Sequence, residues 1–228
     1  ENSSNGAVYD NRCEQNAGGL LIFDMPDIPV ANGAKIRVYN NLVFNNNFPN
    51  FSAPGNVVNI LPPGTGMLLM AHTQMEVFNN QIIGHNTLGM GIVSWLFTGK
   101  PYKSKTYVPY CSAIEVYNNR FEQGTEAVDT TTDFGRLMVA VVGGYKDILT
   151  DGIFDPNSLT EEGGFVDKAR ICLHNNGPVR FVNLNAAAGA QPADMIKNKN
   201  EDSSIYDCTL DSININGHDS WMTKLKPS

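Results

Sequence analysis

A short phrase recurs along this chain and constrains its fold more than any other feature. Each copy has an apolar residue, a ring-bearing residue and a polar pair that ends in Asn. The copies begin at Val8, Val38, Val77, Val116 and, in a degenerate form, Leu173. Such repeats indicate a stack of similar units, because one unit cannot bury its apolar face alone. The sequence therefore predicts a solenoid.

Each phrase is typical of a β-strand that ends in a turn. Ile36 and Val38 alternate with a charged and an aromatic residue, so one face of the strand turns inward. The first residue of the polar pair suits a left-handed turn. The second can stack on its equivalent one coil away, in a row of hydrogen-bonded Asn side chains. A second apolar run follows most copies, for example at 66–70 and 137–142, and we expect it to form a second strand.

The spacers between these runs are too short for the helical crossovers of βαβ units. We therefore predict an all-β fold, a right-handed parallel β-helix with long loop insertions; hairpins of a β-sandwich are the alternative. The predicted coils span residues 1–185, and an irregular C-terminal tail, residues 186–228, packs on the last coil. No amphipathic helix precedes the first phrase, so we expect earlier coils or another chain to cover the N-terminal end.

Charge and hydropathy exclude some partners. The chain has 228 residues, a formal net charge of −7 and a pI of about 5.0. A nucleic-acid backbone needs a basic face, so it is not an expected partner. A polyanionic sugar remains open, because a local basic groove can lie on an acidic protein. No apolar run is long enough to predict a membrane span.

Four cysteines, at positions 13, 111, 172 and 208, are compatible with disulfides in an extracytoplasmic protein. Cys172 and Cys208 are the better candidate pair, because the aperiodic tail could be fastened to the last coil. Cys13 and Cys111 lie at different places in their repeats, so two free thiols are at least as good a reading as a bridge between loops.

Insertions interrupt the repeats at 24–34, 45–66, 98–112, 122–136 and 143–167. In solenoids, insertions often cluster on the binding side. The third insertion combines aromatic faces, on which sugars stack, with cations that attract carboxylated sugars. The predicted substrate-binding residues are Lys100, Tyr102, Lys103, Lys105 and Arg136. The alternative is a solvated loop whose tyrosines pack on the body of the protein.

Abstraction of a proton from a uronate requires a base, an acid and a cation beside the carboxylate. The predicted catalytic residues are His72, Tyr107 and Tyr110, although a lone His at a strand end is more often simply hydrogen-bonded. Calcium is the one cofactor considered, and the acidic residues that could hold it are Asp147, Asp151, Asp155 and Asn157. Their spacing does not match a known calcium loop, so a solvated loop is the favoured reading.

Several segments carry a family resemblance. They include residues 19–27, the phrase at Val38 with residues 46–51, the Pro62-Pro63-Gly64 turn and residues 206–208. Across residues 7–210 the chain resembles the bacterial parallel β-helix repeat proteins of the pectate-lyase-like superfamily, of the NosD and mannuronan C5-epimerase type. The resemblance implies the C-terminal part of such a protein, exported to the periplasm or the exterior.

The epimerase members of that superfamily carry an Asp-Pro-His-Asp motif in their catalytic site. Here the only Asp-Pro is Asp155-Pro156, with no His after it, so no catalytic residue is transferred from the family. Two functions therefore stay open. One is recognition or modification of an acidic polysaccharide, by a lyase or C5-epimerase if the chain is an enzyme. The other is a non-catalytic rod within an extracellular assembly.

Overall fold

The computed structural model describes residues 1–162, 164–187 and 190–215. Its strands form three sheets, and every strand pair within them is parallel. Sheet A contains β1 (Gly6–Tyr9), β4 (Ala34–Tyr39), β7 (Thr73–Phe78), β10 (Ser112–Tyr117) and β13 (Ile171–His174). Sheet B contains β2 (Arg12–Glu14), β5 (Leu42–Phe44), β8 (Gln81–His85) and β11 (Arg120–Gln123). Sheet C contains β3 (Gly18–Phe23), β6 (Thr65–Met70), β9 (Leu88–Val93), β12 (Lys146–Thr150) and β14 (Phe181–Asn183).

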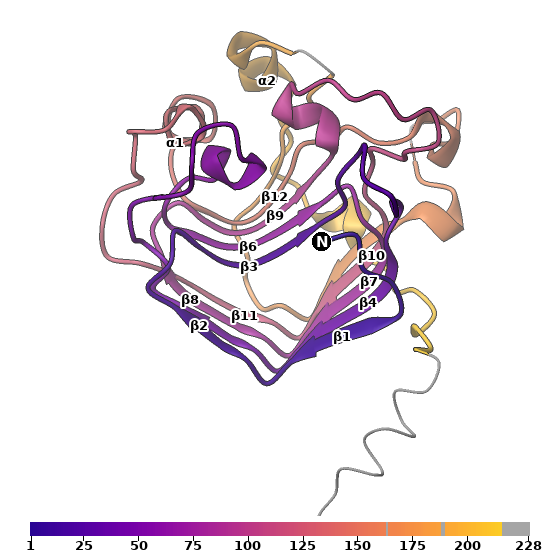
Figure 1. Ribbon diagram of the computed structural model, residues 1–228, viewed down its shortest axis with the longest axis horizontal. Helices are drawn as coiled ribbons and strands as arrows, with labels where there is room; N and C mark the ends of the chain where they lie inside the picture. The colour runs from indigo at the N-terminus through magenta and orange to yellow at the C-terminus, as the bar shows by residue number, and fades with distance from the viewer. Residues whose placement is uncertain (163, 188–189, 216–228) are drawn as a thin grey trace, which may run out of the picture.

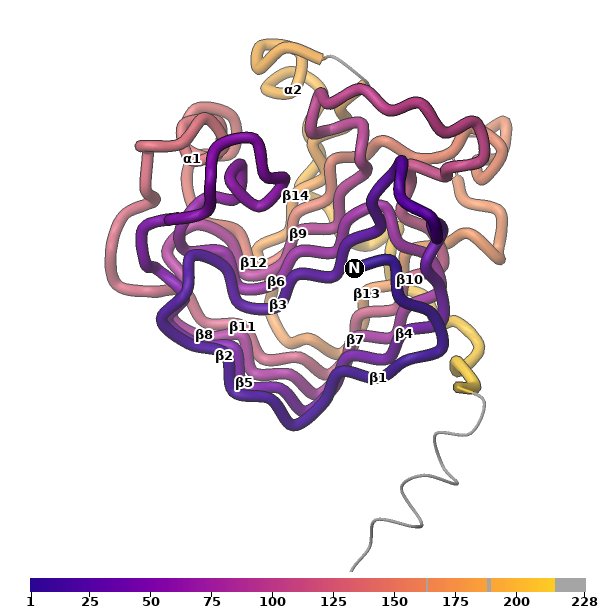
Figure 2. The backbone as a smooth tube through the Cα atoms, viewed as in Figure 1, coloured from indigo at the N-terminus to yellow at the C-terminus, as the bar shows by residue number. Residues whose placement is uncertain are grey.

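In four successive passages the chain visits sheets A, B and C in the same order, and the last passage runs from β13 of sheet A to β14 of sheet C (Figures 1 and 2). We call one such passage a circuit. The expectation of two strands per repeat is wrong, because a short strand of sheet B separates the two predicted ones. Most sheet B strands have only three or four residues. Alternation over so short a segment gives almost no sequence signal.

The repeated phrases lie on one another in register, as the repeat predicts. Val8 pairs with Val38, Val38 with Val77, and Val116 with both Val77 and Leu173. Inward side chains of all three sheets form one core, which includes Val38 of sheet A, Val43 and Ile82 of sheet B, and Met67, Leu69 and Met90 of sheet C. Parallel strands with a shared interior thus account for the apolar alternation of the phrase.

The corner between sheets A and B consists of the polar pair alone. Its first residue has a φ between 53° and 56° at Asp10, Asn40, Asn79, Asn118 and Asn175, which confirms the predicted left-handed turn. The second residues form the predicted ladder. In it Asn41 Nδ2 donates to Asn80 Oδ1 over 2.9 Å, and Asn80 Nδ2 donates to Asn119 Oδ1 over the same distance. Asn11 and Asn176 occupy the end rungs.

A second ladder lies at the corner between sheets B and C. Asn16 Nδ2 donates to Asn46 Oδ1, and the backbone N–H of Asn46 donates to Nδ1 of His85 over 3.3 Å. The other ring nitrogen of His85 donates to the Val43 carbonyl over 3.1 Å. Because Nδ1 accepts, this buried imidazole is neutral with its hydrogen on Nε2.

Residues 137–142, expected to form a strand, are helical instead. Helix α1 (Asp133–Leu137) is capped by the Thr132 side chain and continues into a π-helical turn, η3 (Met138–Val142), which ends at the left-handed Gly143. The sheet C strand of this circuit is β12. A short apolar run fits a buried helix as well as a buried strand, so periodicity could not separate the two.

The remaining helices are short. They are η1 (Val57–Ile60), η2 (Trp95–Thr98), η4 (Pro156–Ser158), η5 (Asp167–Ala169), α2 (Pro192–Asn198) and η6 (Ser204–Tyr206). None of the helices in the described ranges has the length and apolar character that crossing a membrane requires. Helix α2 lies in the segment predicted to be irregular, and residues 216–228 of that predicted tail lie outside the described residues.

The two ends of the stack differ. At the N-terminal end, the inward side chains Val8, Leu20 and Ile22 are only partly buried. At the other end, Tyr206 lies 1% exposed over the last circuit, with its ring centroid 5.1 Å from that of Phe181. The predicted Cys172–Cys208 disulfide is confirmed and fastens this end, whereas Cys13 and Cys111 are free thiols.

Candidate functional site

A cleft of about 840 Å³ lies on the outer face of sheet C. Its floor consists of outward side chains from three neighbouring strands, Phe23 of β3, Leu68 and Met70 of β6, and Val93 of β9. Its walls come from segments far apart in sequence, namely residues 49–63, η2, α1 and the residues around α2. Figure 1 shows these segments gathered over sheet C. The volume falls within the range of roughly 300–1,000 Å³ that is usual for small-molecule sites.

The insertions predicted at 45–66 and 122–136 therefore meet around this cleft, and the one at 98–112 contributes its first residues, Thr98 and Gly99. The polar groups at its rim already have protein partners. The Asn50 amide donates to the carbonyls of Val58 and Leu61, and the Thr132 hydroxyl accepts from the N–H of Gly135. With these groups satisfied, a ligand would gain most of its binding free energy from apolar contact.

His72, predicted as a base, is fully buried at the corner that follows β6. Its two ring nitrogens each lie 3.1 Å from a backbone carbonyl, those of Thr73 and Ser3. A neutral ring has one N–H, so it bonds to one of the two carbonyls at a time. Burial lowers the pKa of His72, with the neighbouring carbonyls and Asp24 acting in the opposite direction. The residue holds the N-terminal segment against the sheet.

Tyr107 is also buried, and its hydroxyl donates to the Asp24 carbonyl over 2.7 Å. Burial raises the pKa of this phenol, so the hydroxyl keeps its proton at neutral pH. Tyr110 is half-buried, and burial raises its pKa as well. Tyr102 and Tyr110 pack with Tyr107 in the apolar cluster on the outer face of sheet C, so these rings serve packing in the described structure.

The insertion that carries the predicted lysines is fixed to its neighbour, residues 24–33. The Asp27 carboxylate accepts the backbone N–H groups of Lys103 and Ser104, and Asn32 exchanges hydrogen bonds with Thr106 and Val108. The side chains of Lys103 and Lys105 are exposed, whereas Lys100 is half-buried. Lys103 and Lys105 are thus presented to solvent, and none of the three lysines lines the cleft.

Arg136 is the one predicted substrate-binding residue at the cleft. Its guanidinium forms an ion pair with Asp133 and donates to the carbonyls of Thr130 and Thr131. Asp129 also lies at this rim. The cleft therefore brings together two carboxylates and one cation that is already paired, which does not favour a polyanionic ligand there.

The residues considered for calcium serve other contacts. Asp147 pairs with Arg180, and the buried Asp151 accepts the backbone N–H groups of Ser94 and Ile153. Burial raises the pKa of Asp151 to about 6. Asp155 caps η4 and bonds to Asn157. In the part of the chain that the structure describes, no group of three or more His, Cys, Asp or Glu residues is placed to hold a metal ion.

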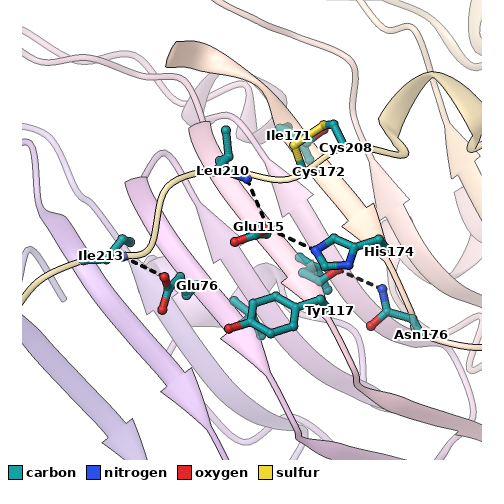
Figure 3. A network of polar contacts seen from close by, with 12 residues as sticks. Glu76, Glu115, Tyr117, Ile171, Cys172, His174, Asn176, Cys208, Leu210 and Ile213 are labelled. Carbon is teal, nitrogen blue, oxygen red and sulfur yellow. Dashed lines mark hydrogen bonds and ion pairs between the residues drawn. A yellow bond between two sulfur atoms is a disulfide. The ribbon is translucent and has the colours of Figure 1, made fainter. Parts of the chain in front are cut away.

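A second candidate region lies on the outer face of sheet A (Figure 3). Glu76 and Glu115 occupy equivalent positions on neighbouring strands and are 2% and 6% exposed. Arg37 Nε lies 2.7 Å from the Glu76 carboxylate, and His174 Nε2 lies 3.0 Å from that of Glu115. Residues 207–215, which we call the strap, cover both carboxylates.

Beside these charges runs a ladder of stacked rings, formed by Tyr9, Tyr39, Phe78, Tyr117 and His174. Successive centroids lie 5.0 to 5.1 Å apart. The Arg37 guanidinium lies 5.1 Å from the Phe78 centroid, so the ion pair of Arg37 and Glu76 is in contact with the ring ladder. Sequence reasoning missed this region, although aligning the phrases places Arg37, Glu76 and Glu115 at one repeat position.

Comparisons with protein-family models, with curated proteins and with solved structures found no match for this chain.

Proposed function

We propose that this chain is a non-catalytic binding module whose cleft on sheet C takes a small molecule with an apolar body, of the lipid type. The observation that carries the proposal is the cleft itself, with its apolar floor and its walls built from four separate segments. Its rim charges are few and include the Arg136–Asp133 pair, so the ligand is uncharged along most of its length. The predicted action on an acidic polysaccharide stays a prediction, to which the exposed Lys103 and Lys105 remain available.

The same proposal includes the finer fold and location. We infer that the circuits form a right-handed parallel β-helix of the pectate-lyase-like kind, because three parallel sheets are visited in a fixed order around one core. The Cys172–Cys208 disulfide supports a protein that works outside the reducing cytoplasm. This location can be tested on protein taken from its native source, by alkylating the free thiols and measuring the mass. Alkylation of two cysteines, Cys13 and Cys111, is expected if the disulfide is present, and alkylation of all four would contradict the proposed location.

Fluorescence titration with a polyene C18 fatty acid tests the binding function. We expect saturable binding of one molecule per chain. Leu68→Asn places a polar side chain on the cleft floor and should weaken binding at least about tenfold, which corresponds to roughly 1.4 kcal/mol. The matched control is Leu42→Asn, which changes an equally half-buried, outward Leu on sheet B and should leave binding unchanged.

Three results would overturn the proposal. They are no saturable binding, equal weakening by both variants, and displacement of the probe by polygalacturonate or by a neutral oligosaccharide. The last result would instead assign the cleft to sugars. Thermal melts of both variants show whether any loss reflects unfolding.

A further inference from the structure

The strap crosses the strands of sheet A instead of pairing alongside them (Figure 3). Near its start, Cys208 is joined to Cys172 of β13 by the disulfide. The Leu210 N–H then donates to Glu115 of β10 over 3.1 Å, and the Ile213 N–H donates to Glu76 of β7 over 2.7 Å. The strap therefore passes one strand for every two or three residues.

The two carboxylates bind backbone groups of the strap, and its side chains take no part in these two bonds. Each carboxylate also has a partner on the sheet itself, Arg37 for Glu76 and His174 for Glu115. The sheet thus holds two buried acceptors in a fixed frame, and charged acceptors form the stronger class of hydrogen bond. Any extended segment with free N–H groups at this spacing satisfies the same acceptors.

The Cys172–Cys208 disulfide favours the strap over any other segment on the outer face of sheet A. A short tether gives its segment an effective concentration of about millimolar, so a free peptide in solution competes poorly with a tethered one. Apolar contact adds to the hold, since Leu210 and Ile213 are half-buried and Ile215 is buried. Of the two bridged residues, Cys172 is fully buried and Cys208 is only partly buried, so a reducing thiol approaches the disulfide from the side of Cys208.

We propose that the outer face of sheet A is a binding groove for an extended peptide segment, and that the strap occupies it as an intramolecular ligand locked by the Cys172–Cys208 disulfide. The trans occupant is a peptide of another molecule that offers backbone N–H groups to Glu76 and Glu115. A dithiol opens the lock. It donates two electrons and two protons to the disulfide, which yields the thiols of Cys172 and Cys208, and the dithiol itself becomes a disulfide.

The test uses three forms of the full chain: the oxidised protein, Cys208→Ser, and Cys208→Ser combined with Leu210→Pro and Ile213→Pro. The two prolines remove both strap donors. The probe is a fluorescein-labelled synthetic peptide of residues 206–215 with Ser in place of Cys208, followed by anisotropy. We expect no binding to the oxidised form, weak binding to Cys208→Ser, and binding at least about tenfold tighter to the proline form, whose own strap no longer competes.

Peptide chemistry supplies a control that leaves the protein unchanged. N-methylation at Leu210 removes a donor and should abolish binding, whereas N-methylation at Ser212, which is not one of the two donors, should not. Hydrogen exchange gives a second readout, and the amides of Leu210 and Ile213 should exchange at least about tenfold faster in Cys208→Ser than in the oxidised protein. Unchanged exchange, no binding to a folded proline form, or equal effects of the two methylations would each overturn the proposal.

Discussion

The outer faces of sheets A and C differ although their inner faces share one core. Sheet A presents Arg37, Glu76 and Glu115 outward, beside a ladder of rings, and the strap closes over them. Sheet C presents Leu68, Met70 and their neighbours outward, beneath the cleft. Sheet A strands alternate in sequence, whereas β3, β6 and β9 of sheet C consist mainly of continuous apolar runs, the pattern of strands that are covered on both faces.

The corners explain which sheet receives the insertions. Between sheets A and B only two residues intervene in each of the first four circuits, because the Asn ladder fixes the turn. Residues 45–64 and 124–145 fall between sheets B and C, and residues 24–33, 94–111 and 151–170 fall between sheets C and A. Insertions therefore border sheet C on both sides and can wall a cleft there. The difference teaches that one repeated turn can direct where the variable segments go.

The largest expected effect comes from breaking the corner that carries no insertions. Asn80 is 1% exposed, receives hydrogen bonds from Asn41 and donates to Asn119 and to the Val38 carbonyl. Asn80→Ala leaves several buried groups without partners and should lower the free energy of unfolding by about 4 kcal/mol. Urea unfolding followed by circular dichroism measures this. Asn79→Gly, in the same turn, keeps the left-handed backbone and should cost less than about 1 kcal/mol, and equal losses would contradict the ladder's role.

The second effect concerns the anchor that distinguishes sheet A from sheet C. Replacing Cys172 and Cys208 by Ser opens a loop with a sequence separation of 36. Loop-closure entropy predicts a loss of about 3 to 4 kcal/mol. Cys13→Ser changes a free thiol and should leave the unfolding midpoint nearly unchanged. Should the double variant unfold at the wild-type urea concentration, the strap end would be held by packing alone.

The two corners that flank sheet C should respond oppositely to acid. Burial lowers the pKa of His85 from 6.5 to about 4, so the folded state binds fewer protons in this range and stability is lost as pH falls from 6.5 to 4. Burial raises the pKa of Asp151 from 3.8 to about 6, so stability is gained as pH falls from 6 toward 3.8. Each of these two residues can change the free energy of unfolding by at most about 3 kcal/mol.

Single variants separate the two terms. His85→Asn, which places the residue of the neighbouring rung Asn46 in this position, should remove the part of the acid-induced loss that comes from His85. Asp151→Asn should remove the compensating gain, so its free energy of unfolding should fall most steeply between pH 6.5 and 4. His72 contributes with the same sign as His85 and is present in both variants, so it cancels in the comparison. Urea unfolding at pH 4, 5 and 6.5 measures the slopes, and parallel slopes would contradict the assignment.

Much of the frame could be predicted because it repeats. The left-handed turn, the Asn ladder, the inward residues and the Cys172–Cys208 pair followed from the phrase and from the aperiodic tail. Sheet B could not be predicted, since its strands are too short to show alternation, and the apolar run at 137–142 suits helix and strand equally. The cleft depends on contacts between distant insertions. The burial of Glu76 and Glu115 depends on a strap whose sequence has no period.

The smallest expected effect sharpens the comparison to one residue type in two settings. Glu115 accepts two hydrogen bonds under the strap, whereas Glu122 pairs with Arg120 on the outer face of sheet B and its side chain is 45% exposed. Glu115→Gln keeps an acceptor but removes its charge, so it should cost about 1 to 2 kcal/mol. Glu122→Gln should cost less than about 0.5 kcal/mol, because exposed pairs contribute little. Urea unfolding of both variants measures the difference, and the strap amides should exchange faster only in Glu115→Gln. If both variants had the wild-type free energy of unfolding, the disulfide and apolar contacts would hold the strap, and the hydrogen bonds to the carboxylates would contribute nothing to its stability.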